Sequence, residues 1–223
     1  MSLQLILLQL SEGMLSTIWI FVLTLLFSLP LGLVIAFGRM SRNVILRNIT
    51  RIYISIMRGT PLMLQLLVVY FGPYYIFGIS ISSSYRAYAV IIAFALNYAA
   101  YFAEIYRSGI ASMPKGQYEA AKVLGYSRTQ TFFTIILPQV IKRILPSVTN
   151  EVITLVKDTS LAFSIAYAEM FTQAKALAAS QKSMVPFVAA PFFITFSILL
   201  WRRSWNSSRR RWHITNRIGR ISG

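Results

Sequence analysis

The sequence predicts an all-α protein, a polytopic membrane bundle of about five transmembrane helices with one long cytoplasmic loop. Hydrophobic residues make up 56% of the chain and charged residues only 13%, against roughly a quarter charged in a soluble domain. The mean hydropathy is +0.61. A soluble protein of 223 residues has no core large enough to hide so much apolar surface. Several apolar stretches also approach the roughly 20 residues that a spanning helix needs.

The five predicted spans cover residues 14–37, 60–77, 87–106, 144–168 and 185–201. The first contains Pro30, which a membrane helix tolerates. The second begins at Thr60 and Pro61, a residue pair suited to the N-cap and the first helical position. The fifth is the shortest. The stretch 3–10 is apolar but too short to span, and we interpret it as an interfacial helix.

Charge sets the expected orientation. The chain has 22 Lys and Arg against 6 Asp and Glu, and most of the basic residues lie in the segments 39–51, 107–143 and 202–220. Because Lys and Arg favour cytoplasmic loops, we expect the N-terminus outside and the C-terminus inside the cell. This distribution between apolar stretches argues against nucleic-acid binding.

Composition excludes several kinds of site. The chain has no cysteine, so disulfides and thiolate metal sites are excluded. A single histidine, His213, leaves no His-rich metal site. No cleavable signal peptide is evident, because the first residues carry no basic segment.

The loop 109–143 is polar but has the pattern of a helix. Glu119, Ala120 and Ala121 are good helix formers, and Gly125 is suited to end the helix at C′. A second amphipathic run, 129–136, is expected to end before Pro138. Two short helices of this kind suit docking into a groove of a partner protein. A solvated connector fits the same pattern, and physical reasoning leaves both interpretations open.

Ionisable residues also fall inside predicted spans. Lys157 and Asp158 lie near the midpoint of the fourth, and Glu104 lies near the cytoplasmic end of the third. Asn97, Tyr101 and Glu104 share one helix face through their spacing. Charged groups in a membrane are costly and usually mark function.

The loop carries a motif of fixed spacing. It reads Glu-Ala-Ala, three residues, Gly, nine residues, Ile, one residue and Leu-Pro, and it comprises Glu119, Ala120, Ala121, Gly125, Ile135, Leu137 and Pro138. At every spacing it resembles the EAA loop of ATP-binding-cassette (ABC) importer permeases. Three further segments, 58–61, 97–104 and 157–161, are similar to the polar-amino-acid branch of these permeases, and the resemblance covers roughly residues 10–195.

The resemblance implies a transmembrane domain over 10–205 and a basic cytoplasmic tail over 206–223. The coupling residues would be Glu119, Ala120, Ala121, Gly125, Leu137 and Pro138, seated on a cytoplasmic ATPase dimer. It further implies a second permease subunit, an extracytoplasmic substrate-binding protein, a bacterial cytoplasmic membrane and alternating access. The chain has no phosphate-binding G-x-x-x-x-G-K-[ST] loop. We therefore expect a transport subunit and not an enzyme, with no cofactor in this chain and with ATP and Mg bound by the partner ATPase.

The same resemblance implies a substrate site formed by Asn97, Tyr101, Glu104, Lys157, Asp158 and Ser160. A free amino acid carries an ammonium and a carboxylate, and both need partners inside an apolar bundle. Alternatively, Lys157 pairs with Glu104 or Asp158 as an interhelical bridge without a ligand. We expect Arg58 at headgroup level beside the entry of the second span, and Glu151 at the cytoplasmic edge beside Lys142 or Arg143.

Other functions fit less well. An ABC permease for another small polar solute keeps the coupling loop, whereas a stand-alone channel or secondary transporter does not need one. Which amino acid is carried, and whether two identical or two related permeases pair, cannot be read from the sequence. The resemblance fades after about Phe196, and residues 202–223 contain seven Arg and no acid. An anionic-lipid anchor and a shifted reading frame both account for this tail.

Overall fold

The computed structural model describes residues 3–192 and 195, and every regular element within them is helical. The helices are α1 (Leu3–Arg39), α2 (Val44–Gly59), α3 (Leu62–Phe77), α4 (Tyr85–Ala111), α5 (Lys115–Val123), α6 (Arg128–Gln130), α7 (Leu137–Asp158) and α8 (Met170–Gln181). A π-helical segment, Thr131–Ile136, precedes α7, and a 3-10 segment, Thr159–Ile165, follows it. A last helical stretch covers 185–192. The predicted all-α membrane class is confirmed.

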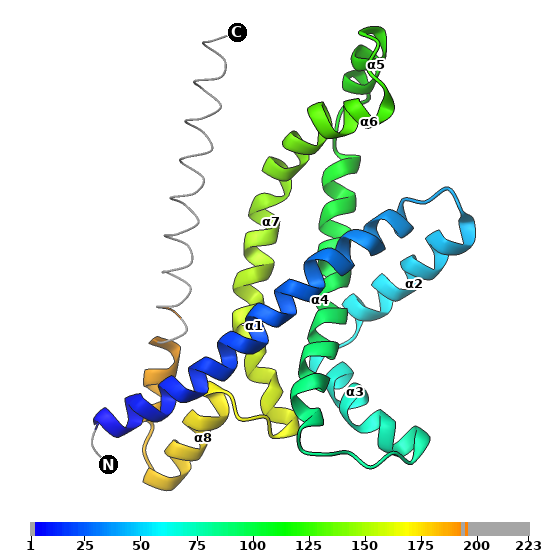
Figure 1. The fold of residues 1–223 in the computed structure, drawn as a ribbon. Helices are drawn as coiled ribbons and strands as arrows, with labels where there is room; N and C mark the ends of the chain where they lie inside the picture. Colours follow the sequence, from blue (N-terminus) through cyan, green and yellow to red (C-terminus); the bar gives the residue numbers. More distant parts are fainter. Residues whose placement is uncertain (1–2, 193–194, 196–223) are drawn as a thin grey trace.

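The described residues contain three segments long and apolar enough to cross a membrane: Ile6–Arg39, Tyr85–Ala111 and Arg128–Ile165. Helices α2 and α3 meet at a bend of 108°, and they make a fourth segment if the bent pair is counted as one span. Figure 1 shows α1 and α7 running beside α4, with α5 and α6 at one end of the bundle and α8 at the other. Most of the predicted fifth span (185–201) and the whole tail (206–223) lie outside the described residues.

Helix α1 is longer than the sequence suggested. The stretch 3–10 is part of α1 and not a separate interfacial helix. Ile6 and Leu10 are buried in a cluster with residues of α8. Gly13 does not break the helix. It is a point of close contact with α8, because a Cβ there would lie 2.7 Å from the Cα of Met170.

The second predicted span (60–77) corresponds to α3, which forms a broken pair of helices with α2. Most of the predicted cytoplasmic loop 39–51 is the start of α2, which Asn43 caps by accepting hydrogen bonds from the backbone N–H groups of Ile45 and Leu46. Thr60 ends α2 and does not cap α3, since its hydroxyl donates to the carbonyl of Ile56 at 2.8 Å. Pro61 occupies the N-cap of α3.

The fourth predicted span also has different ends. The predicted stop before Pro138 is wrong, because the chain passes from the π-helical segment directly into α7. Pro138 falls in the first turn of α7, where the missing N–H does little harm. The α-helix ends at Asp158, and the 3-10 segment continues to Ile165. Ala166 follows it with a φ of 54°, which turns the chain away.

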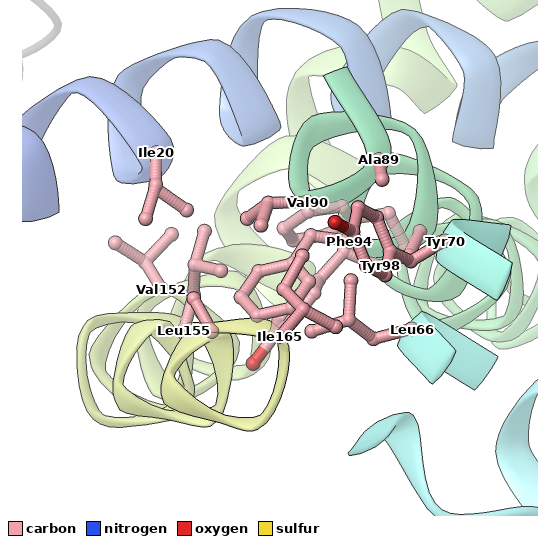
Figure 2. Packing of buried hydrophobic residues seen from close by; sticks show 13 residues of the cluster. Ile20, Leu66, Tyr70, Ala89, Val90, Phe94, Tyr98, Val152, Leu155 and Ile165 are labelled. Atoms are coloured by element: carbon pink, nitrogen blue, oxygen red, sulfur yellow. The ribbon is translucent and has the colours of Figure 1, made fainter. Parts of the chain in front are cut away.

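The main core gathers around α4. Figure 2 shows Phe94 and Tyr98 of α4 in contact with Leu66 from α3 and Leu155 from α7. Phe94 and Leu155 are fully buried. In a bilayer such contacts stabilise through close packing, because lipid tails are as apolar as the side chains.

Small residues line the contact between α1 and α4, and we call this contact the α1–α4 seam. Thr24, Ser28, Gly32 and Ala36 are spaced four residues apart on α1 and are buried. Across from Gly32 lie Ala99 and Phe102 of α4. Small side chains at this spacing allow two helix backbones to approach closely in a membrane.

Helix α8 is tied to α1 at the end of the bundle opposite α5 and α6 (Figure 1). Glu169 is buried and caps α8, accepting hydrogen bonds at 2.7 Å from the N–H groups of Phe171 and Thr172. The N–H of Met170 donates to the hydroxyl of Thr17 on α1 at 3.3 Å. Burial raises the pKa of the Glu169 carboxyl, and the hydrogen bonds it accepts act in the opposite direction. The sequence analysis did not single out this carboxylate.

Candidate functional site

A carboxylate lies at mid-depth in the bundle. Asp158 ends α7, and its Oδ2 accepts a hydrogen bond of 2.7 Å from the hydroxyl of Tyr98. Tyr98 is fully buried near the middle of α4 (Tyr85–Ala111). Asp158 itself is half-buried, and the adjacent side chain of Lys157 is exposed. Asp158 and Lys157 therefore lie near the middle of the bundle, as the sequence predicted, but at the end of α7 and not within it.

Glu104 has a partner on its own helix. It forms an ion pair with Arg107, one turn further along α4. Within the described part of the chain, neither Glu104 nor Asp158 forms the interhelical bridge to Lys157 that the sequence allowed. Lys157 thus stays available to other groups.

Arg58, at the end of α2, contacts α4. Its guanidinium sits over the ring of Tyr101, 5.1 Å from the centroid, a favourable cation–π arrangement. The end of α2 reaches mid-depth because the carbonyl of Met57 accepts a hydrogen bond from Asn97 of α4. Arg58 therefore contacts α4 through Tyr101, and its expected place at headgroup level stays a prediction.

Glu151 also differs from the expectation. It was expected beside Lys142 or Arg143, yet the guanidinium of Arg143 donates to the carbonyl of Ser112 at 2.9 Å. Glu151 lies about two helical turns deeper and interacts electrostatically with Arg58 and Asp158. Arg58 also interacts electrostatically with Glu104 of α4, so acids and bases from α2, α4 and α7 face a common region of the bundle.

Asn97 and Gln65 hold the bend between α2 and α3. The Asn97 amide donates to the Met57 carbonyl and to the Gln65 side chain, each at 2.9 Å. The Gln65 amide in turn donates to the Thr60 hydroxyl at 2.7 Å. Asn97 is buried and engaged in this scaffold, and its contact with substrate stays a prediction. Gln65 was missed, although a lone amide within the apolar stretch 62–69 was a usable signal.

Ser160 lies beyond the end of α7 and is half-buried. Its hydroxyl donates to the carbonyl of Lys157 at 2.7 Å. This local hydrogen bond tightens the start of the 3-10 segment and leaves the second lone pair of the hydroxyl oxygen as an acceptor. Its predicted contact with substrate is likewise untested.

Helices α5 and α6 form a knob at the end of the bundle that we call the coupling knob (residues 115–130). Gly125 has a φ of 81°, and the N–H of Tyr126 donates to the carbonyl of Ala121 at 3.0 Å, as in a Schellman C-cap. The predicted helix stop at Gly125 is confirmed. Ser127 and Gln130 form a capping box that starts α6. The knob is therefore a well-defined turn between two helices.

The knob presents both polar and apolar side chains. Glu119 and Ala120 are exposed, whereas Ala121 is buried. Val123 is 88% exposed and Leu124 is 73% exposed. Contiguous exposed apolar patches mark protein contacts, and these two exposed apolar residues are adjacent in the chain. The sequence analysis missed Val123 and Leu124, which directly precede the glycine of the motif.

Leu137 and Pro138, the last residues of the motif, begin α7 and are half-buried. They do not share the exposed surface of the knob with Glu119. The motif thus spans two parts of the fold: the surface of the knob, and the joint that connects it to α7.

The chain resembles known transport proteins over most of its length. Residues 28–206 match the model of the family described as binding-protein-dependent transport system inner membrane component. The chain is 38% identical over 185 residues to the L-cystine transport system permease protein TcyB of Bacillus subtilis, covering 82% of this chain and 77% of that protein. It is 41% identical over 150 residues to the putative glutamine transport system permease protein GlnP of Rickettsia conorii, covering 67% of each.

The fold has solved counterparts. A crystal structure of an amino acid ABC transporter with histidines has a TM-score of 0.82 and 31% identity, covering 91% of this chain and 94% of the other. An inward-facing structure of the MetNI methionine ABC transporter has a TM-score of 0.66 and 16% identity, covering 94% and 98%, and bears on the fold alone. With spanning helices and a family match over most of its length, the chain belongs to the binding-protein-dependent transport system inner membrane components.

Proposed function

We propose that this chain is the permease subunit of an ABC importer that carries polar amino acids across the bacterial cytoplasmic membrane. The proposal rests on one observation: acids and bases from α2, α4 and α7 gather at mid-depth around Asp158 and Arg58. Charged groups inside a bilayer are costly and normally face a pathway. A zwitterion crossing an apolar bundle needs partners of both signs.

The substrate class follows from this balance and from the relatives. Glu104 is paired by Arg107, which leaves Asp158 and Glu151 against Arg58 and Lys157. Equal numbers of acids and bases suit a neutral polar amino acid better than a cationic one. Relatives at 38% and 41% identity carry names as L-cystine and glutamine permeases, which supports the same class.

The coupling knob is the proposed seat of the ATPase. A separate ATPase dimer would bind ATP and Mg and close against the knob, and the bundle would open outward by alternating access. A second permease subunit and an extracytoplasmic substrate-binding protein complete the importer. The N-terminus lies outside and the C-terminus inside, because the basic residues of 39–51 and 107–143 lie at the end of the bundle that carries the knob. The transmembrane domain is 10–205, and the basic tail is 206–223.

Uptake in proteoliposomes containing the permease, its ATPase and its binding protein tests the function. Radiolabelled glutamine or cystine should enter only when ATP is present inside with the ATPase, and unlabelled polar amino acids should compete. Failure of every amino acid to compete would overturn the substrate class. Uptake that needs neither ATP nor the ATPase would favour a stand-alone transporter.

Asp158→Asn is expected to lower uptake at least tenfold and leave assembly with the ATPase intact. Asparagine keeps an oxygen that accepts from Tyr98, so the change removes charge and little else. The expected loss is that of a charged hydrogen bond between the carboxylate and the substrate. A hydrogen bond to a charged group contributes about 1.5–3 kcal/mol, equivalent to roughly ten- to hundredfold in uptake. Tyr98→Phe is the matched control, because it removes the hydrogen bond of 2.7 Å and keeps the carboxylate. Wild-type uptake by Asp158→Asn would show that the substrate site lies elsewhere.

A further inference from the structure

We propose that Gln117 and Gln139 link the coupling knob to α7, so that α5 and α7 move as one body during transport. This inference rests on the proposed function. The two side chains form a reciprocal amide pair: Nε2 of Gln117 donates to Oε1 of Gln139 at 2.9 Å, and Nε2 of Gln139 donates to Oε1 of Gln117 at 3.0 Å. Two antiparallel hydrogen bonds fix both the distance and the rotation of the paired groups.

The pair is anchored on the α7 side. The Gln139 amide also donates to the carbonyl of Ile135, one turn earlier, at 2.7 Å. Both N–H groups of this amide are therefore used, which fixes its orientation. Gln117 and Gln139 are half-buried, so the pair is partly protected from competition by water.

The link lies where the chain would otherwise bend. The segment Thr131–Ile136 between the knob and α7 is π-helical, and π-helical turns are local irregularities that occur frequently at functional sites. A knob pivoting there would lose its motion before it reached α7. The Gln117–Gln139 pair spans this segment from α5 to α7, and the Gln139–Ile135 hydrogen bond crosses its junction with α7.

Within residues 3–192, the two hydrogen bonds of this pair are the only side-chain hydrogen bonds that join α5 to another element. One turn further along α7, Arg143 donates to the Ser112 carbonyl at the end of α4. The beginning of α7 is thus held by polar links to α5 and to the end of α4.

Helix α7 leads from this link to the candidate substrate site. It has 22 residues from Leu137 to Asp158, a length of roughly 30 Å. Gln139 is near its first turn, and Asp158, bonded to Tyr98, is its last residue. A displacement of the knob carried by the glutamine pair therefore reaches the mid-membrane carboxylate through one continuous helix. Gln117 and Gln139 are positioning residues and do not touch substrate.

The first test measures coupling in the full reconstituted importer. Gln139→Leu removes the pairing groups and keeps a similar side-chain volume. We expect it to retain the ATPase on co-purification and to hydrolyse ATP within twofold of wild type, while amino-acid uptake per ATP falls at least fivefold. The double variant Gln117→Glu with Gln139→Lys replaces the amide pair by an ion pair and should restore at least half of the wild-type ratio.

The outcomes separate the possibilities. An unchanged uptake-to-ATP ratio in Gln139→Leu overturns the link. Loss of the ATPase together with uptake, without rescue by the ion pair, means that the glutamines only stabilise the knob, and it also overturns the link. Failure of the proposed function is distinguishable, because wild type itself would then show no ATP-dependent uptake.

Cross-linking gives a second, independent test. The chain contains no cysteine, so Gln117→Cys with Gln139→Cys introduces the only two thiols. Without reagent this variant should be uncoupled like Gln139→Leu. A short bifunctional thiol reagent should raise its uptake-to-ATP ratio at least threefold, whereas a monofunctional reagent should not. A cross-link that forms but leaves the ratio low, or blocks uptake, would show that α5 and α7 must separate and would overturn the proposal.

Discussion

Leu124→Asp is expected to abolish association of this permease with its ATPase. Leu124 is 73% exposed at the end of α5, beside Val123 at 88%, and both lie on the coupling knob, away from the spanning segments. An aspartate in place of Leu124 would be buried unpaired when the knob docks. An uncompensated buried charge costs about 3–5 kcal/mol, which weakens binding on the order of a hundredfold or more. Co-purification from mild detergent measures the effect directly.

A matched control shows whether the loss is local. Met184 is 70% exposed and follows α8, a helix that lies at the end of the bundle opposite the knob (Figure 1). Met184→Asp introduces the same charge at a similarly exposed apolar residue and should retain the ATPase. Glu119→Lys, on the exposed face of α5, is expected to weaken association less than Leu124→Asp. Recovery of wild-type amounts of ATPase with Leu124→Asp would move the docking surface off this part of the knob.

Local features of the knob could be predicted from sequence because neighbours in the chain decide them. Gly125 takes a φ of 81°, which glycine adopts at little cost, so the helix stop was readable from the sequence alone. Helix α2 was not readable. Arg47 and Arg51 gave its first half the composition of a loop, and α2 is held by packing of Ile54 against Ala100 and Ala103 of α4. Such contacts between distant segments have no local signature.

The candidate site shows the same division. The spacing of Asn97, Tyr101 and Glu104 placed them on one helix, and that helix is α4. The partners of Asn97 and Tyr101 depend on the bend of 108° between α2 and α3, which brings Arg58 onto the Tyr101 ring. A bend held by amides from two helices cannot be derived from periodicity. The position of Asp158 near the middle of a span was predictable from the apolar pattern around it. Its hydrogen bond to Tyr98 was not, because it depends on how α7 packs against α4.

Gly32→Val is expected to disrupt the bundle as a whole. A Cβ on Gly32 would lie 2.9 Å from the Cβ of Phe102 and 3.0 Å from the carbonyl oxygen of Ala99. Those atoms belong to or adjoin the α4 backbone, so no side-chain rotation relieves the clash. Overpacking costs typically about 1–3 kcal/mol, and branching at Cβ adds to the crowding. A cost of about 3 kcal/mol corresponds to a fall of ~10 °C in Tm for a chain of this size.

Size-exclusion chromatography after heating, detected by fluorescence, measures this fall in detergent. Gly72→Val is the matched control, because a Cβ on Gly72 of α3 would meet only the end of the Ile76 side chain at 3.8 Å. We expect its Tm to stay close to wild type, and Gly32→Ala to lie between the two valine variants. A graded loss at Gly32 alone would show that the α1–α4 seam, and not helix propensity, sets the stability, because both glycines are helical and both changes are the same. Equal Tm values for the two valine variants would mean that α1 and α4 are not in close backbone contact at Gly32.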